Sequence, residues 1–191
     1  MSDLSIQKEI SLLLHDSISP CLHFECEAVQ SEQLWQLLRH SEAELGAVLR
    51  GEGYYENLTL REYLRLFAGI SGHRDIDFAI REMALSDLAH SRMRALSAGQ
   101  KKRAAIAREL LKQPLTLFVE EPLQGVEEES ARILLHWLEE LPRGLRVITA
   151  SASTKHVFLL PGPSFYFSAE ELRPLEPAPS AADAGLSLIH I

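Results

Sequence analysis

The sequence predicts an α/β fold with a mainly parallel sheet, and two observations carry this prediction. The order strand, helix, strand occurs twice, first over 21–49 and again over 115–150. The runs LTLFV (115–119) and LRVITA (145–150) are continuously apolar, as expected of parallel strands that helices cover on both faces. A chain of 191 residues, 46% of them hydrophobic, can bury the core of one such domain.

The N-terminal segment predicts a small antiparallel unit followed by a helix and a strand. ISLLLHD (10–16) and CLHFECEA (21–28) are typical of short strands separated by a turn at Pro20. SEQLWQLLRH (31–40) has leucines at helical spacing behind a serine, and LGAVL (45–49) has the composition of a buried strand.

A helical insertion is predicted over about 59–94. Thr59 and Glu62 stand three apart before an apolar stripe, which is the spacing of a capping box. The segment DIDFAIREMAL (75–85) predicts a second helix in this insertion.

The next segment predicts a capped helix, a strand and an acidic pair. Ser97 and Gln100 again have capping-box spacing, and Pro114 stops the helix that they open. The strand 115–119 then ends at Glu120 and Glu121. Paired carboxylates at the carboxyl end of a strand lie where open α/β sheets bind ligands, although a solvated acidic strand end has the same sequence.

The C-terminal part predicts a helix over 127–141, the strand 145–150 and a hairpin formed by VFLL and SFYFS. We expect the domain to span 1–172. The segment 173–191 is rich in Pro and Ala, predicts a disordered tail, and ends in LSLIHI, which resembles translated adapter sequence.

The charges are unevenly distributed. The net charge of −8 argues against a general affinity for nucleic acid, yet residues 81–112 hold eight Lys and Arg against three acids. Within this window Ser97 to Gln100 open a helix, where free N–H groups and the helix dipole favour an anion. Gly99 permits close backbone approach, and we expect Lys101, Lys102 and Arg103 to keep the potential positive. A capped basic helix with no ligand remains the alternative.

The 27 residues LSAGQKKRAAIARELLKQPLTLFVEEP resemble the signature loop and Walker B strand of ATP-binding cassette (ABC) proteins. The resemblance extends with lower quality over about 45–160. It implies a P-loop NTPase-like ABC cassette with antiparallel N-terminal strands, a mainly parallel sheet and a helical subdomain.

The resemblance also implies roles for individual residues. The signature loop would face the γ-phosphate of an ATP bound to the opposite subunit, through Leu96, Ser97, Ala98, Gly99 and Gln100. Glu120 stands where an aspartate organises the Mg²⁺ shell, and its longer arm is expected to impair that site because Mg²⁺ demands near-octahedral geometry. Glu121 stands where a glutamate polarises the attacking water.

Several positions depart from the family pattern. No G-x-x-x-x-G-K-[ST] occurs, and the expected place reads FECEAVQSEQLWQLL, with neither glycine nor lysine. Arg50 replaces the Q-loop glutamine, Glu127 the D-loop aspartate and Ala152 the switch histidine. Hydrolysis of ATP in the chain's own pocket is therefore not expected.

The resemblance predicts a degenerate ATP-binding subunit of an ABC transporter, of exporter type. It would share ATP and Mg²⁺ with a competent ABC ATPase subunit, or with a second copy of itself, and an integral membrane permease would dock near 50–58. We expect a cytoplasmic protein, peripheral at the inner face of the cell membrane, since no apolar run approaches a membrane span. The alternatives are a regulatory or scaffold pseudo-ATPase, and an ordinary ABC ATPase with an unrecognised phosphate loop.

Overall fold

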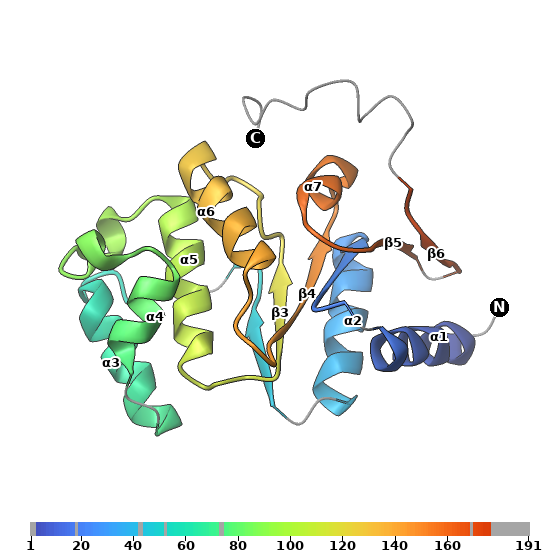
Figure 1. Cartoon of the computed structure of the whole chain (residues 1–191), viewed down its shortest axis with the longest axis horizontal. Helices are drawn as coiled ribbons and strands as arrows, with labels where there is room; N and C mark the ends of the chain where they lie inside the picture. Colours follow the sequence, from blue (N-terminus) through green and yellow to red (C-terminus); the bar gives the residue numbers. More distant parts are fainter. Residues whose placement is uncertain are drawn as a thin grey trace.

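The computed structural model describes residues 3–17, 19–41, 44–51, 53–72, 75–168 and 170–176. These residues form a six-stranded sheet with the order β2-β3-β4-β1-β5-β6 (Figure 1). The strands are β1 (Cys21–Glu25), β2 (Leu45–Val48), β3 (Thr116–Glu120), β4 (Arg146–Ser151), β5 (Ser164–Phe167) and β6 (Leu172–Pro174). All pairings are parallel except that of β5 with β6, which confirms the predicted mainly parallel sheet.

Helices cover both faces of this sheet. They are α1 (Asp3–Asp16), α2 (Ala28–Ser41), α3 (Leu60–Ser71), α4 (Ile76–Glu82), α5 (Ala98–Leu110), α6 (Glu128–Glu139) and α7 (Thr154–Leu159), with 3-10 turns η1 (Ser86–Leu88) and η2 (Met93–Ala95). In Figure 1, α3 and α4 lie beyond α5 at one end of the molecule, and α1 lies at the opposite end. None of the helices in the described part of the chain is both long and apolar enough to cross a membrane.

Two apolar clusters lie on the two faces of the sheet. Alternation along β3 sends Leu117 and Val119 into one cluster and Phe118 into the other. The Phe118 side is covered by α1 and α2, whereas the Leu117 side is covered by α5, α6 and the helical insertion. Because both faces of β3 are buried, its sequence is continuously apolar rather than alternating.

The predicted antiparallel N-terminal strand pair is wrong. Residues 10–16 belong to the helix α1, and β1 pairs in parallel with both β4 and β5. The buried side chains of Ile6, Ile10 and Leu14 recur every four residues and form the inner face of α1. Only Ile10 and Leu14 lie within the segment 10–16, so that segment alone does not show the helical repeat.

The C-terminal hairpin also differs from its prediction. The segment VFLL contributes to α7, which Ser153 caps by accepting a hydrogen bond from the His156 N–H. β5 instead forms its hairpin with β6, which includes Arg173 and Pro174 from the predicted tail. The rest of that tail from residue 177 lies outside the described residues.

The two predicted capping boxes are present. The Thr59 side chain accepts from the Glu62 N–H, and the Glu62 carboxylate accepts from the Thr59 N–H at 2.8 Å. Ser97 and Gln100 make the same reciprocal pair at the start of α5. These caps fix where α3 and α5 begin.

Candidate functional site

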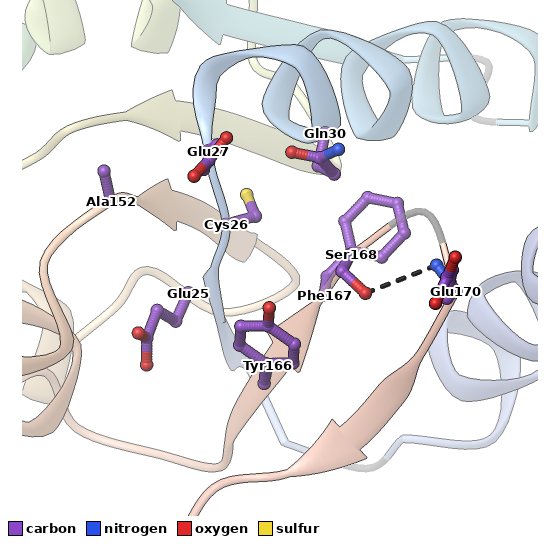
Figure 2. A pocket seen from close by; sticks show the side chains of 9 residues that line it. All are labelled: Glu25, Cys26, Glu27, Gln30, Ala152, Tyr166, Phe167, Ser168 and Glu170. Atoms are coloured by element: carbon purple, nitrogen blue, oxygen red, sulfur yellow. Dashed lines mark hydrogen bonds between the residues drawn. The ribbon is translucent and has the colours of Figure 1, made fainter.

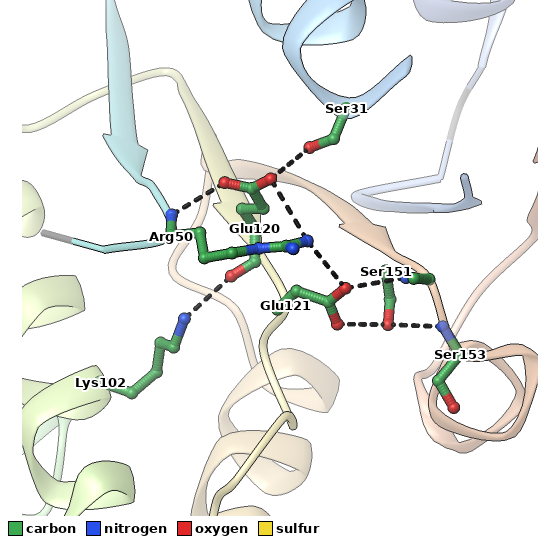
Figure 3. Close-up of polar contacts among 8 residues, drawn as sticks. Ser31, Arg50, Lys102, Glu120, Glu121, Ser151 and Ser153 are labelled. Atoms are coloured by element: carbon green, nitrogen blue, oxygen red, sulfur yellow. Dashed lines mark hydrogen bonds and ion pairs between the residues drawn. The ribbon is translucent and has the colours of Figure 1, made fainter. Parts of the chain in front are cut away.

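Glu120 and Glu121 lie at the carboxyl edge of the sheet, where β3 ends. Glu121 has a φ of 49°, in the left-handed region that few residues other than glycine adopt. Its N–H donates to the carbonyl oxygen of Ala150 at 2.8 Å, which ties the turn to β4. The reversal brings the two consecutive carboxylates close to one another rather than to opposite faces (Figure 3).

Glu120 is held by the helix α2 and by the segment that follows β2. Its Oε1 accepts from the Ser31 hydroxyl of α2 at 2.9 Å, and its Oε2 accepts from the Arg50 backbone N–H at 2.8 Å. The Arg50 Nη2 lies 3.7 Å from Oε1 (Figure 3).

Glu121 is more deeply buried, with 4% of its side chain exposed. Its Oε1 accepts from Arg50 Nη2 at 3.2 Å and from the Ala152 N–H at 2.9 Å, and its Oε2 accepts from the Ser151 hydroxyl at 2.8 Å. The backbone oxygen of Glu120 accepts from Lys102 Nζ at 2.8 Å, which ties α5 to the same corner.

This arrangement does not fit a magnesium ion. The Arg50 guanidinium bridges the two carboxylates, and each of their four oxygens already accepts a hydrogen bond from the protein. A metal would have to displace the Arg50 guanidinium before it could lie between the two carboxylates. The pair is therefore neutralised in part by a side chain of the same molecule.

The connection between β1 and α2 is too short to wrap a phosphate. It consists of Cys26 and Glu27, whereas a P-loop takes about eight residues. The adjoining pocket, of about 480 Å³, is lined by Glu25, Glu27 and Glu170 among others, and no Lys or Arg stands among its described lining residues (Figure 2). An anionic ligand would meet net repulsion there.

Cys26 forms the floor of this pocket as a neutral thiol. Burial raises its pKa to about 12, and the nearby Glu121 and Glu120 carboxylates act in the same direction. Its N–H donates to the Ser151 oxygen at 2.9 Å, which holds the short connection against β4. The thiol is thus poorly suited to act as a nucleophile.

The loop that opens α5 is occupied by a carboxylate. Ser97 Oγ donates to Glu127 Oε1 at 2.6 Å, the Gly99 N–H donates to Glu127 Oε2 at 3.1 Å, and the Ser130 hydroxyl also donates to Oε1. Burial alone would raise the Glu127 pKa, but these hydrogen bonds, with one from its own backbone, bring it down to about 2. Glu127 is therefore an anion at any physiological pH.

Basic residues near the start of α5 contact other parts of the chain rather than the loop donors. Arg103 is 3% exposed, and its Nη1 donates to the Met83 and Ala84 oxygens at 2.8 and 2.9 Å. Lys101 Nζ lies 6.0 Å from the centre of the Tyr54 ring. The Arg103 head group caps the end of α4, and its charge also interacts with the Glu127 carboxylate that binds the loop.

The predicted site residues form two groups. Glu120, Glu121, Arg50 and Ala152 meet at the edge of the sheet, and Glu127 meets Ser97 and Gly99 at α5. In the loop, Leu96 is buried, Ala98 is exposed and Gln100 completes the cap.

Sequence reasoning missed the contributions of Ser31, Lys102 and Ser151. The sequence suggests Ser31 as a possible N-cap of its helix, but α2 begins at Ala28, and the Ser31 hydroxyl binds Glu120 instead. Its place in the first turns of the helix after β1 is the one signal that could have indicated it.

Comparison with known proteins identifies the family of the chain. The family model described as ABC transporter matches residues 14–124. The cytochrome c biogenesis ATP-binding export protein CcmA of Paracoccus denitrificans is 36% identical over 101 residues, which cover 52% of this chain and 48% of CcmA. The chain thus spans about half the length of this relative.

Two solved structures share the fold. A metal-chelate type ABC transporter in an inward-facing conformation matches with a TM-score of 0.68 and 14% identity, over 82% of this chain and 72% of that one. The dimeric bacterial ABC transporter cassette MJ0796 matches with a TM-score of 0.63 and 16% identity, over 83% and 85%. On the fold and the matched residues, the chain belongs to the ABC transporter family, as an ATP-binding cassette.

Proposed function

We propose that this chain is a non-hydrolysing cassette subunit of an ABC transport complex and that its signature loop completes the ATP site of a partner cassette. One observation carries the proposal: the Arg50 guanidinium lies 3.2 Å from Glu121 and 3.7 Å from Glu120, where the family binds a metal and activates water. The chain's own pocket would then be without a catalytic role.

Electrostatics supports the loss of hydrolysis. A nucleotide phosphate needs backbone donors and cations, but the connection of Cys26 and Glu27 supplies neither a long loop nor a lysine. Hydrogen bonds from Arg50, Ala152 and Ser151 stabilise the Glu121 carboxylate and so make it a weaker base toward an attacking water.

The signature loop, in contrast, keeps its local geometry. The capping box of Ser97 and Gln100 is intact, and Gly99 presents its N–H at the start of α5. An anion at this point would be stabilised by the helix dipole and by the Ser97 hydroxyl. The loop can therefore serve a nucleotide held by another subunit.

The proposed assembly follows from family membership. The partners would be a competent cassette, or a second copy of this chain, and a membrane permease that contacts residues near 50–58. ATP and Mg²⁺ would be held mainly by the partner, and the complex would place this chain at the cytoplasmic face of the membrane. An exporter type is supported by the similarity to CcmA, which is an export protein.

A substitution in the signature loop tests the proposal. In the complex purified through this chain, Ser97→Arg should lower ATPase activity at least about tenfold, because a bulky cation would replace the cap and fill the approach to α5. Ser86→Arg, at an exposed serine of η1, is the matched control and should leave activity within about twofold.

The same experiment distinguishes the proposed function from the alternative that the chain is a scaffold. If this chain only holds the complex together, Ser97→Arg would leave the ATPase activity of a correctly assembled complex unchanged. Such a result, with assembly verified by size-exclusion chromatography, would contradict the proposed role of the loop.

A further inference from the structure

Glu127 stands where a phosphate bound to the signature loop would stand. Its two carboxylate oxygens accept from Ser97 Oγ at 2.6 Å and from the Gly99 N–H at 3.1 Å, which are the donors that the loop offers to an anion. The Ser130 hydroxyl adds a third donor from the first turn of α6. The anion site is thus filled from within the chain.

Glu127 and Ser130 pack tightly against Gly99. A Cβ at position 99 would lie 2.5 Å from the Ser130 Cβ and 2.6 Å from Glu127 Oε2. Ser130 is fully buried against the loop. No room remains for a second anion while the Glu127 carboxylate is in place, because oxygen atoms of two anions would overlap at the same N–H group.

The Glu127 side chain is nevertheless placed so that it can leave the signature loop. Glu127 is exposed and precedes α6 as its N-cap residue, yet it makes no capping hydrogen bond within α6. Rotation of its side chain would return the carboxylate to water without opening the hydrophobic core. The contact is therefore a displaceable one, unlike the buried Glu121 cluster.

We propose that Glu127 is an autoinhibitory occupant of the signature loop, which a phosphate bound to a partner cassette must displace before the composite site forms. The inference rests on the proposed function, because it assigns a regulation to the same loop. A carboxylate imitates a phosphate in charge and in hydrogen-bond acceptance, so it competes for the same donors. The partner's ATP site would close only when its phosphate outcompetes Glu127.

The test uses the isolated full chain and inorganic phosphate. The backbone amide of Gly99 is followed by ¹⁵N nuclear magnetic resonance during a phosphate titration at constant ionic strength. In Glu127→Ala the Gly99 signal should shift with saturation, at an affinity at least about tenfold higher than in the wild type, as the energy of an anion at a helix N-terminus allows. Glu129→Ala, at a neighbouring exposed acid of α6, should behave as the wild type.

Two results would overturn the inference. One is equal phosphate binding by the wild type and Glu127→Ala; the other is a folded Glu127→Ala whose Gly99 signal does not respond. If Glu127→Ala fails to fold, Glu127→Gln keeps the shape and removes the charge, and it should show the same gain. A parallel titration with ATP and Mg²⁺ reads the amide of Gln30, which lines the chain's own pocket, so a response there would contradict the proposed function and leave the Gly99 result intact.

Discussion

Replacing Arg50 by glutamine should destabilise the chain by leaving the acidic pair without its cation. Glu121 and Glu120 have 4% and 12% of their side chains exposed, whereas Arg50 has 46% exposed. Removing one partner of a fully buried ion pair costs about 3–5 kcal/mol, and an exposed pair contributes about 0–1 kcal/mol. Solvent screening of the half-exposed Arg50 places the expected loss of unfolding free energy at about 1–2 kcal/mol.

Urea unfolding, followed by tryptophan fluorescence at neutral pH, measures this loss. The midpoint of Arg50→Gln should fall by about 0.5–1 M relative to the wild type. The vacated position should also accept a divalent cation, so about 10 mM Mg²⁺ should stabilise Arg50→Gln by about 1.4 kcal/mol if its dissociation constant is about 1 mM. The same Mg²⁺ should not move the wild-type midpoint.

Arg39→Gln, at an exposed position of α2, is the matched control for the loss of one positive charge. The reasoning would be refuted if Arg50→Gln were as stable as Arg39→Gln. It would also be refuted if Mg²⁺ stabilised the wild type and Arg50→Gln equally, since Arg50 would then not occupy the cation position.

Three further predictions concern stability. Burial lowers the pKa of His23 from 6.5 to about 4, so the unfolded chain binds a proton at a higher pH than the folded chain does. The free energy of unfolding should therefore fall by about 3 kcal/mol as the pH drops from 6.5 to about 4. In urea titrations at several pH values, His23→Gln should reduce this dependence on pH. Gly99→Ala should cost about 1–3 kcal/mol by overpacking, whereas Gly53→Ala, with no neighbour within 4 Å, should be near neutral in the same assay. Thr59→Ala should lower the thermal midpoint through loss of the α3 cap, worth about 1 kcal/mol, and a normal midpoint would contradict the capping role.

Local features of the fold were predictable from the sequence, and features set by distant contacts were not. The capping boxes at Thr59 and Ser97, and the apolar strand of 115–119, depend on neighbouring residues and are present. The segment 10–16 is ambiguous, because its three consecutive leucines suit a strand as well as a helix. The deciding residue, Ile6, lies one turn upstream and buries its side chain with Ile10.

The residues of the candidate site were likewise predictable from local motifs, whereas their long-range contacts were not. The resemblance to the family placed Glu120, Glu121 and the signature loop, and the structure brings each group to an edge of the fold. The contacts that change their chemistry join Arg50 to Glu121 across 71 residues and Glu127 to Ser97 across 30. No local pattern specifies such pairs, since they arise only when the sheet aligns the strand ends.

We propose that the chain's own pocket does not bind a nucleotide together with its metal. Calorimetric titration of the purified chain with ATP and Mg²⁺ tests it most directly. No saturable heat is expected up to about 1 mM ATP, because the pocket has acids and a two-residue connection in place of a phosphate loop. Saturable binding with a micromolar dissociation constant would contradict it.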